Sequence, residues 1–483
     1  MKPESAARKA RGVNRRKVLG AMASGLVAST TLGAQAHSAP LAGGISRQAT
    51  QHLLKLNAIA ARHGGNRAAG LPGFEYSARY VESQLHRVGF RTRRQKFNYT
   101  RIDHLRATVE QTRPQRRAIP NSPAEGLAAS TSGGNTGELV APRDAFGDST
   151  ESWTGTDARG KVALVQLRPN AVRGARTGRV NGCHGGRPSS RHRIAADQTE
   201  AARQALIHAR EAGAVAVLFF LDQVDFPIGL LFDAPGDIDL PPAAVIFSSD
   251  ATALRRDMGT AGATVRVDLE LRERAIETFN LLTVPWDTTH RNVFGAHLDS
   301  VPTGPGIDDN ASGSGLLLSL ALSAGIRKSH GIQFCWWGGE EDGMRGSQRY
   351  VDTEDLEPIN GYFNTDMVAA PNYVISVYGN GPQRHYIDHF SATGQTWIEG
   401  PLDGMSDQIP FLEKGIPVAG VDTVHSAPAR LKSEKEEELF GGTAGQPFDP
   451  NYHASGDTIS NISAKALSIC TAASYAALRA VAH

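Results

Sequence analysis

The chain has 483 residues, of which 40% are hydrophobic, and its 51 Lys and Arg are nearly balanced by 49 Asp and Glu. This length and apolar content suffice for two hydrophobic cores. The lack of a large basic excess argues against nucleic acid or an anionic membrane surface as the partner. Three cysteines, Cys183, Cys335 and Cys470, are too few for a disulfide framework.

The first 36 residues have the pattern of an export signal. The pair Arg15-Arg16 precedes a weakly apolar run that ends near Gly33, and Ala34-Gln35-Ala36 is a typical cleavage site of small residues. An arginine pair before a mild apolar segment is typical of a twin-arginine signal, and an amphipathic basic tail is the alternative interpretation. We therefore expect export to the periplasm or the medium.

Cleavage after Ala36 would change the charge of the protein. Residues 1–36 hold seven Lys and Arg and one Glu, so the mature chain keeps 44 basic and 48 acidic residues. A mildly acidic protein is not expected to bind nucleic acid. No later apolar run is long enough to cross a bilayer, and no Cys near the cleavage site offers a lipid anchor. We therefore expect no membrane association after cleavage.

Helices and strands alternate through the first half of the mature chain. Apolar spacing predicts helices at 48–64, 75–88 and 201–211 and strands at 91–100, 161–165, 214–221 and 242–247. Asp250 is placed to cap the helix after the last of these strands. Residues 168–193 form a loop rich in Gly and Arg. It could steer acidic peptides toward a cleft, although solvated loops commonly have this composition.

Two buried strands of a parallel sheet are predicted further along, at 293–296 and 332–337. Polar residues follow each strand at once: His297 and Asp299 after the first, and Glu340, Glu341 and Asp342 after the second. The remaining predicted elements are a helix at 313–325, strands at 373–377 and 416–421, and a closing helix that begins at Ser463.

Other polar residues complete a candidate metal site. They are Asp308, Asp309 and Asn310 in a loop rich in Gly and Pro, Asp366 after another strand, and Tyr452 and His453 near the end of the chain. Each motif alone is more often an ordinary hydrogen-bonded pair or a solvated helix start. Because parallel strands end at one edge of a sheet, imidazoles and carboxylates should converge there. A set without Cys favours zinc or a similar divalent ion, and it is large enough for two.

Together these motifs resemble those of the zinc exopeptidases of the aminopeptidase Y type, peptidase family M28, which include secreted bacterial leucyl aminopeptidases. The matching segments, in the same order along nearly the whole mature chain, are residues 295–301, 304–310, 336–341, 364–367, 452–453 and 457–458. The resemblance implies an α/β fold of the phosphorylase/hydrolase-like type, with a mixed, mostly parallel twisted sheet flanked by helices. Residues 37–114 and 276–483 would form the peptidase domain, and residues 115–275 an inserted protease-associated domain.

The resemblance also implies roles for individual residues. Two zinc ions per chain are expected, with these ligands: His297 and Asp366 for one, Glu341 and His453 for the other, and Asp309 bridging them. Three more residues match catalytic positions: Glu340 the general base that acts with a metal-bridging hydroxide, Asp299 the hydrogen-bond partner of His297, and Tyr452 a support for the tetrahedral intermediate. A cis peptide bond between Asp309 and Asn310 is also implied.

The implied function is that of an exported dizinc metallo-aminopeptidase that hydrolyses N-terminal residues from peptide substrates. Several alternatives stay open at this point. A glutaminyl cyclase-like acyltransferase has the same fold with a single zinc, and a carboxypeptidase or dipeptidase could use the same site. A non-catalytic binding protein that works through the insert is a further possibility.

The chain departs from the family pattern at two positions. No Cys lies between Cys335 and Cys470, so the disulfide that some secreted relatives carry near the substrate cleft is absent. Asp342 follows Glu341 where an apolar residue is common, which adds negative charge beside the predicted ligand. Neither departure removes a ligand.

Overall fold

The structure is a computed structural model that describes residues 28–124, 130–131, 133–168, 192–220, 240–285, 289–325, 331–402, 406–428 and 430–482. Most of the predicted export signal, Cys183 and nearly all of the loop at 168–193 lie outside these ranges. Residues 28–36 belong to helix α1 (Ala28–Arg62). None of the helices in the described ranges combines the length and hydropathy that a bilayer-spanning segment needs.

One large sheet organises the described part of the chain, with the strand order β13-β12-β14-β11-β9-β10-β8-β4-β5-β6-β7-β3. At its centre four strands run parallel, namely β14 (Val418–Asp422), β11 (Ile359–Thr365), β9 (Arg291–His297) and β10 (Ile332–Trp337). Every residue of β10 and β14 is buried, as expected for central strands. This confirms the predicted fold class and the strands predicted at 293–296 and 332–337.

The edge of this part of the sheet is short and less regular. β12 (Ser376–Gly379) runs antiparallel to β14, and β13 (Ile398–Glu399) pairs with β12. The strand predicted at 373–377 therefore begins three residues later, at Ser376.

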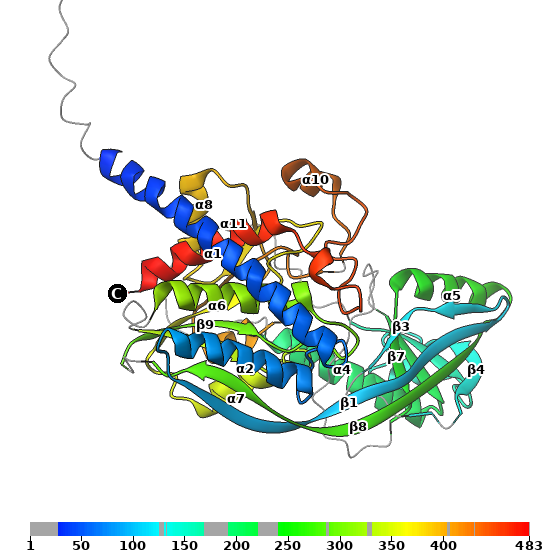
Figure 1. Ribbon diagram of the computed structural model, residues 1–483. Helices are drawn as coiled ribbons and strands as arrows, with labels where there is room; N and C mark the ends of the chain where they lie inside the picture. The colour runs from blue at the N-terminus through cyan, green and yellow to red at the C-terminus, as the bar shows by residue number, and fades with distance from the viewer. Residues whose placement is uncertain are drawn as a thin grey trace, which may run out of the picture.

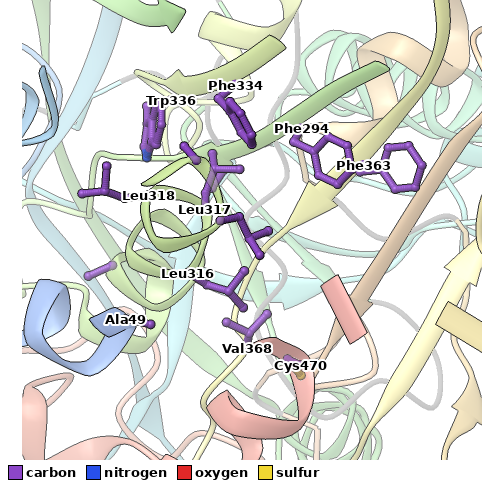
Figure 2. Packing of buried hydrophobic residues seen from close by; sticks show 14 of the residues in the cluster. Ala49, Phe294, Leu316, Leu317, Leu318, Phe334, Trp336, Phe363, Val368 and Cys470 are labelled. Carbon is purple, nitrogen blue, oxygen red and sulfur yellow. The ribbon is translucent and has the colours of Figure 1, made fainter. Parts of the chain in front are cut away.

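Helices cover both faces of the central strands. On one face α6 (Gly313–Ala324) lies between the sheet and α1, and Figure 2 shows its three leucines, Leu316, Leu317 and Leu318, below Phe334 and Trp336. The same hydrophobic cluster includes α2 (Pro72–Arg87) and α11 (Ala464–Val481). On the other face Tyr350 of α7 (Arg345–Thr353) and Phe411 of α9 (Gln408–Glu413) pack against Trp337. Successive side chains of a strand point to opposite faces of the sheet. Phe334 and Trp336 therefore belong to the first cluster, and Trp337 belongs to the cluster on the other face.

Several smaller predictions can be compared with these elements. Cys335 is buried, as its place in the strand predicted at 332–337 implies. The closing helix α11 starts at Ser463, its N-cap, as predicted, and the Ser463 side chain accepts a hydrogen bond from the backbone amide of Ala466. The other short helices of this part are α8 (Arg384–Thr393), α10 (Glu434–Phe440) and the turn η3 (Ile459–Asn461).

A long two-stranded ribbon joins this main lobe to a second lobe (Figure 1). It consists of β1 (Thr92–Arg113) and β8 (Thr264–Thr283), which pair antiparallel from one end to the other. β8 is bonded to β10 at one end and to β4 (Asn135–Val140) at the other. The strand predicted at 91–100 is therefore only the first part of β1, because charged side chains along the rest hide its pattern.

The second lobe, which we call the insert lobe, has its own parallel strands. β4, β5 (Val162–Gln166), β6 (Ala216–Phe220) and β7 (Ala243–Ile246) follow one another in chain order. The other elements are β2 (Arg117–Ile119), β3 (Asn121–Pro123), α3 (Thr150–Trp153), α4 (His192–Glu211) and α5 (Ser248–Thr260). Two hydrophobic clusters are made entirely of residues between 107 and 269. The domain limits at 115 and 275 stay a prediction: β1 ends at Arg113, just before the first limit, and β8 continues across the second.

The prediction that Asp250 caps a helix is wrong. The N-cap of α5 is Phe247, and Asp250 lies inside the first turn of the helix. Its carboxylate accepts a hydrogen bond from Arg117 instead. An acidic side chain at this position still interacts favourably with the helix dipole.

Candidate metal centre

The five predicted ligands converge at the carboxyl edge of the central strands. Each comes from a different segment: His297 ends β9, Asp309 lies in the turn η1 (Ile307–Ser312), Glu341 follows β10, Asp366 follows β11, and His453 lies in the loop before η3. In the strand order, β9 has β10 on one side and β11 on the other. The chain thus reverses its direction across the sheet at β9, and such switch points are where open α/β sheets form crevices.

Asp309 lies between the two imidazoles. Its Oδ1 is 3.1 Å from Nε2 of His297, and its Oδ2 is 3.3 Å from Nε2 of His453. The other two carboxylates lie on opposite sides of it. Asp366 Oδ1 is 3.2 Å from His297 Nε2, and Glu341 Oε2 is 2.9 Å from His453 Nε2. The five side chains therefore form two donor groups that share one carboxylate.

The local backbone around Asp309 explains how a buried turn can present this side chain. Gly306 has φ 61°, and a Cβ at this residue would lie 2.2 Å from the carbonyl oxygen of Asp309. The expected cis peptide bond between Asp309 and Asn310 is confirmed. The side-chain amide of Asn310 donates to the backbone carbonyl of Thr365 at 2.9 Å, which ties the turn to the end of β11.

The charges of the site do not balance among the described residues. Burial alone would lower the pKa of His297, but Asp366, Glu340 and Asp309 raise it well above its usual value. Burial raises the pKa of Glu340 in the same pocket, and the carboxylates of Asp407 and Asp366 add to this effect. Buried carboxylates in such numbers are costly unless a cation or shared protons compensate.

A divalent cation fits this donor set. Donor atoms of His297, Asp309 and Glu341 all lie within 4.8 Å of one another. Oε1 of Glu341 is buried without a hydrogen-bond partner among the described residues, so it has lone pairs to offer. Imidazole nitrogens and carboxylate oxygens without thiolates are ligands that zinc accepts in catalytic sites.

Glu340 and Asp299 lie beside the donors. Oε2 of Glu340 is 3.9 Å from His297 Nε2, which leaves its carboxylate close to the site. Asp299 is fully buried, which raises its pKa to about 8. Its Oδ1 is 3.8 Å from His297 Nδ1, too far for the hydrogen bond that we expected. Instead its two oxygens accept from the backbone amides of Glu340 at 3.3 Å and Glu341 at 3.4 Å.

Tyr452 lines the same site. Its ring stacks on the imidazole of His453, with centroids 3.8 Å apart. Burial raises the pKa of its hydroxyl well above the usual value, and the carboxylates of Asp309 and Glu341 raise it further. The hydroxyl is therefore a proton donor at neutral pH. An apolar cluster packs beside this ring, consisting of Met367, Ala370, Val374, Val424 and Phe448.

Arg67 is an important residue that the sequence analysis did not single out. Its guanidinium is fully buried and donates to the carbonyls of Leu298, Pro305 and Gly306, the last two at 2.9 and 2.5 Å. These carbonyls lie in the loop between β9 and η1, so one side chain fixes the path of the chain to Asp309. Burial lowers its pKa to about 10, so it stays charged. A single arginine in a loop carries no periodic signal that could have revealed this role.

Two further groups hold the ligands in place. Asp457, which the resemblance had included, accepts from the backbone amides of Asp308 at 2.8 Å and Asp309 at 3.1 Å. Ser406 had no predicted role of its own, and its hydroxyl donates to Oδ2 of Asp366 at 2.6 Å. Asn364 in turn donates to Ser406 at 2.9 Å. Both ends of the site are thus supported by buried hydrogen bonds.

The chain is similar to known peptidases. The model of peptidase family M28 matches residues 282–478. A probable lipoprotein aminopeptidase, LpqL of Mycobacterium tuberculosis, is 31% identical over 452 residues, which cover 86% of this chain and 81% of that protein.

Solved structures show the same fold. An aminopeptidase from Aneurinibacillus sp. strain AM-1 superposes with a TM-score of 0.65 at 20% identity, over 91% of this chain and 94% of that one. BSAP, a zinc aminopeptidase from Bacillus subtilis, superposes with a TM-score of 0.56 at 23% identity, over 89% and 94%. The predicted resemblance is confirmed: the chain belongs to peptidase family M28 and is a hydrolase of the metalloexopeptidase class.

Proposed function

We propose that this protein is an exported dizinc aminopeptidase that removes residues one at a time from the N-termini of peptides. The observation that carries the proposal is the position of Asp309, with one carboxylate oxygen toward each imidazole. This is the arrangement that a pair of metal ions sharing one bridging ligand requires. His297 and Asp366 would hold one zinc, and Glu341 and His453 the other. Similarity over most of the chain to a protein named as an aminopeptidase supports the substrate class.

Zinc bound here would supply Lewis acidity, since it polarises a carbonyl and lowers the pKa of bound water. The chain's own residues account for the proton transfers. Glu340 lies close to the donors, so its carboxylate can accept the proton of the attacking water and return it to the leaving amine. The hydroxyl of Tyr452 can donate to the oxyanion that forms on the scissile carbonyl.

The surroundings of the site favour a substrate with a free amino terminus. The carboxylates of the site outnumber its imidazoles. They would therefore stabilise the α-amine of a substrate, whether it is protonated or faces a metal ion. The apolar cluster of Met367, Ala370, Val374, Val424 and Phe448 is buried and packs beside Tyr452, so it supports the ring of Tyr452 and does not itself contact the substrate.

Two parts of the proposal concern the rest of the chain. The pattern of residues 1–36 supports export by the twin-arginine route, so the enzyme would act in the periplasm or the medium. Residues 115–275 would be a protease-associated insert, a reading supported by the separate hydrophobic clusters of the insert lobe. We expect this lobe to cover the cleft or to select substrates.

The deciding experiment compares peptides that differ only in a free or acetylated amino terminus. We expect release of the first amino acid from the free peptide alone, loss of this release with a chelator, and recovery with zinc. A peptide that begins with Gln serves as the control for cyclase activity, because cyclisation releases ammonia and leaves the chain intact. Equal cleavage of free and acetylated peptides would reject the aminopeptidase assignment, and zinc content measured per chain tests the two-metal site.

A further inference from the structure

Asp342 is the acidic residue that directly follows the predicted ligand Glu341. Its side chain is only 14% exposed. A carboxylate this close to Glu340 and Glu341 adds negative charge to an already acidic site. Its burial is costly unless a neighbouring group donates a hydrogen bond to it or carries a positive charge.

That partner comes from the ribbon and not from the main sheet. The hydroxyl of Tyr99, in β1, donates a hydrogen bond to Oδ2 of Asp342. Arg101, two residues along the same strand face, has Nη1 3.9 Å from the same carboxylate oxygen. The loop also packs closely against the Tyr99 ring, since a Cβ on Gly339 would lie 2.9 Å from the Tyr99 hydroxyl oxygen.

The ribbon holds the same loop at a second place. Asn280 of β8 accepts a hydrogen bond from the Gly338 amide at 3.2 Å and donates to the carbonyl of Gly346 at 2.7 Å. Its cross-strand partner Gln95 accepts from Asn280 at 2.8 Å. The loop from 338 to 346 is thus fixed at both ends by Asn280 and near its middle by Tyr99.

Opposite the ribbon, the buried Asp299 accepts the backbone amides of Glu340 and Glu341. The two residues that would supply the general base and a zinc ligand therefore lie between two anchors. Asp299 belongs to the main lobe, whereas Tyr99 belongs to a strand that continues into the insert lobe.

We propose that Tyr99 is a positioning residue. It acts through Asp342 to hold Glu340 and Glu341 in place beside the proposed ligands at the ends of β9 and β11. The role of Glu340 in this statement rests on the proposed function. The hydroxyl of Tyr99 does not touch the reacting atoms; its effect passes through the carboxylate of Asp342 and the backbone of the loop. The insert lobe is thereby linked to the catalytic loop through β1.

The test uses Tyr99→Phe, Asp342→Asn and the double variant in the full chain. Tyr99→Phe leaves a buried carboxylate without its donor, so we expect kcat to fall by about five- to tenfold with KM changed less than about twofold. The double variant should be no worse than Tyr99→Phe alone, because the two groups act as one unit. Tyr80→Phe is the matched control: it removes a hydroxyl bonded to His52 at 2.6 Å, away from the loop.

Amide hydrogen exchange of the peptide 338–346 gives a readout that does not depend on turnover. We expect about tenfold faster exchange in Tyr99→Phe than in the wild type, and unchanged exchange in Tyr80→Phe. Unchanged exchange in Tyr99→Phe, or effects of the two substitutions on kcat that multiply, would overturn the proposal. If the wild type releases no amino acids, the proposed function fails, while the exchange rates still decide the positioning role.

Discussion

The two lobes contain parallel strands of similar length, but their connections differ. In the insert lobe β4, β5, β6 and β7 are added in one direction, each beside the strand that precedes it in the chain. In the main lobe the chain passes from β9 to β10 on one side and then returns to β11 on the other. Among the described residues, the group that could hold a metal lies at this reversal. The comparison shows that strand order, together with polar residues at strand ends, selects where a site forms.

Replacing the shared carboxylate should have the largest effect. Asp309→Ala removes the donor between the two imidazoles, so we expect bound zinc to fall and activity to drop by at least about 10³-fold. Metal content and kcat are measured together. Asp250→Ala is the control, because it removes a carboxylate of the insert lobe that is bonded to Arg117. An unchanged zinc content in Asp309→Ala would contradict the proposed bridging role.

Glu340→Gln separates proton transfer from metal binding. The substitution keeps the size of the side chain and removes its basicity, so we expect kcat to fall by about 10²- to 10⁴-fold. Zinc content should stay at the wild-type value, because Glu340 is not one of the five proposed ligands. Loss of zinc together with activity would place Glu340 among the ligands instead.

Arg67→Met tests the support of the loop before Asp309. It leaves three buried carbonyls without their donor, so we expect the free energy of unfolding to fall by about 3 kcal/mol and zinc to bind less tightly. Thermal unfolding and zinc titration measure the two effects. Arg79→Met provides the comparison, because Arg79 pairs with Glu75 on an exposed helix surface. Equal changes in unfolding free energy and zinc affinity in the two variants would show that Arg67 does not specifically support the loop before Asp309.

Two leucine substitutions compare the lobes directly. Leu218 of β6 and Leu317 of α6 are both fully buried, so Leu218→Ala and Leu317→Ala should each cost about 2–5 kcal/mol of stability. Only Leu317 belongs to the helix that starts next to η1, so only its substitution should also lower kcat. Leu218→Ala should keep kcat within about twofold of the wild type, since it is remote from the site. A similar loss of kcat in both variants would contradict this separation.

The central strands were predictable because they are buried on both faces. The apolar run 332–337 is short and is followed by two glycines and acidic residues, which favours a strand over a helix. β10 has these same bounds. The ribbon was not predictable to the same degree. β1 continues for 13 residues beyond Thr100, and charged side chains on its exposed face interrupt the apolar pattern there.

The candidate site was predictable where residue type and strand end coincide. His297 ends its strand, whereas Glu341 and Asp366 follow theirs, and parallel pairing alone brings strand ends together. Their supports were hidden because their partners are distant in the chain. Arg67 contacts residues more than 230 positions away, and Tyr99 contacts Asp342 across 243 positions. Such contacts depend on tertiary packing, which has no local signature.

The antiparallel pairing of β1 and β8 bears on how such a two-lobed enzyme can arise. Thr100 and Ala275 are direct partners in the ribbon, so the chain leaves and re-enters the main lobe at facing positions. A turn of about two residues between these positions would close an ordinary hairpin. In evolutionary terms, a lineage could acquire or discard the whole appended lobe by exchanging the tip of a hairpin, without altering the order of any strand behind it.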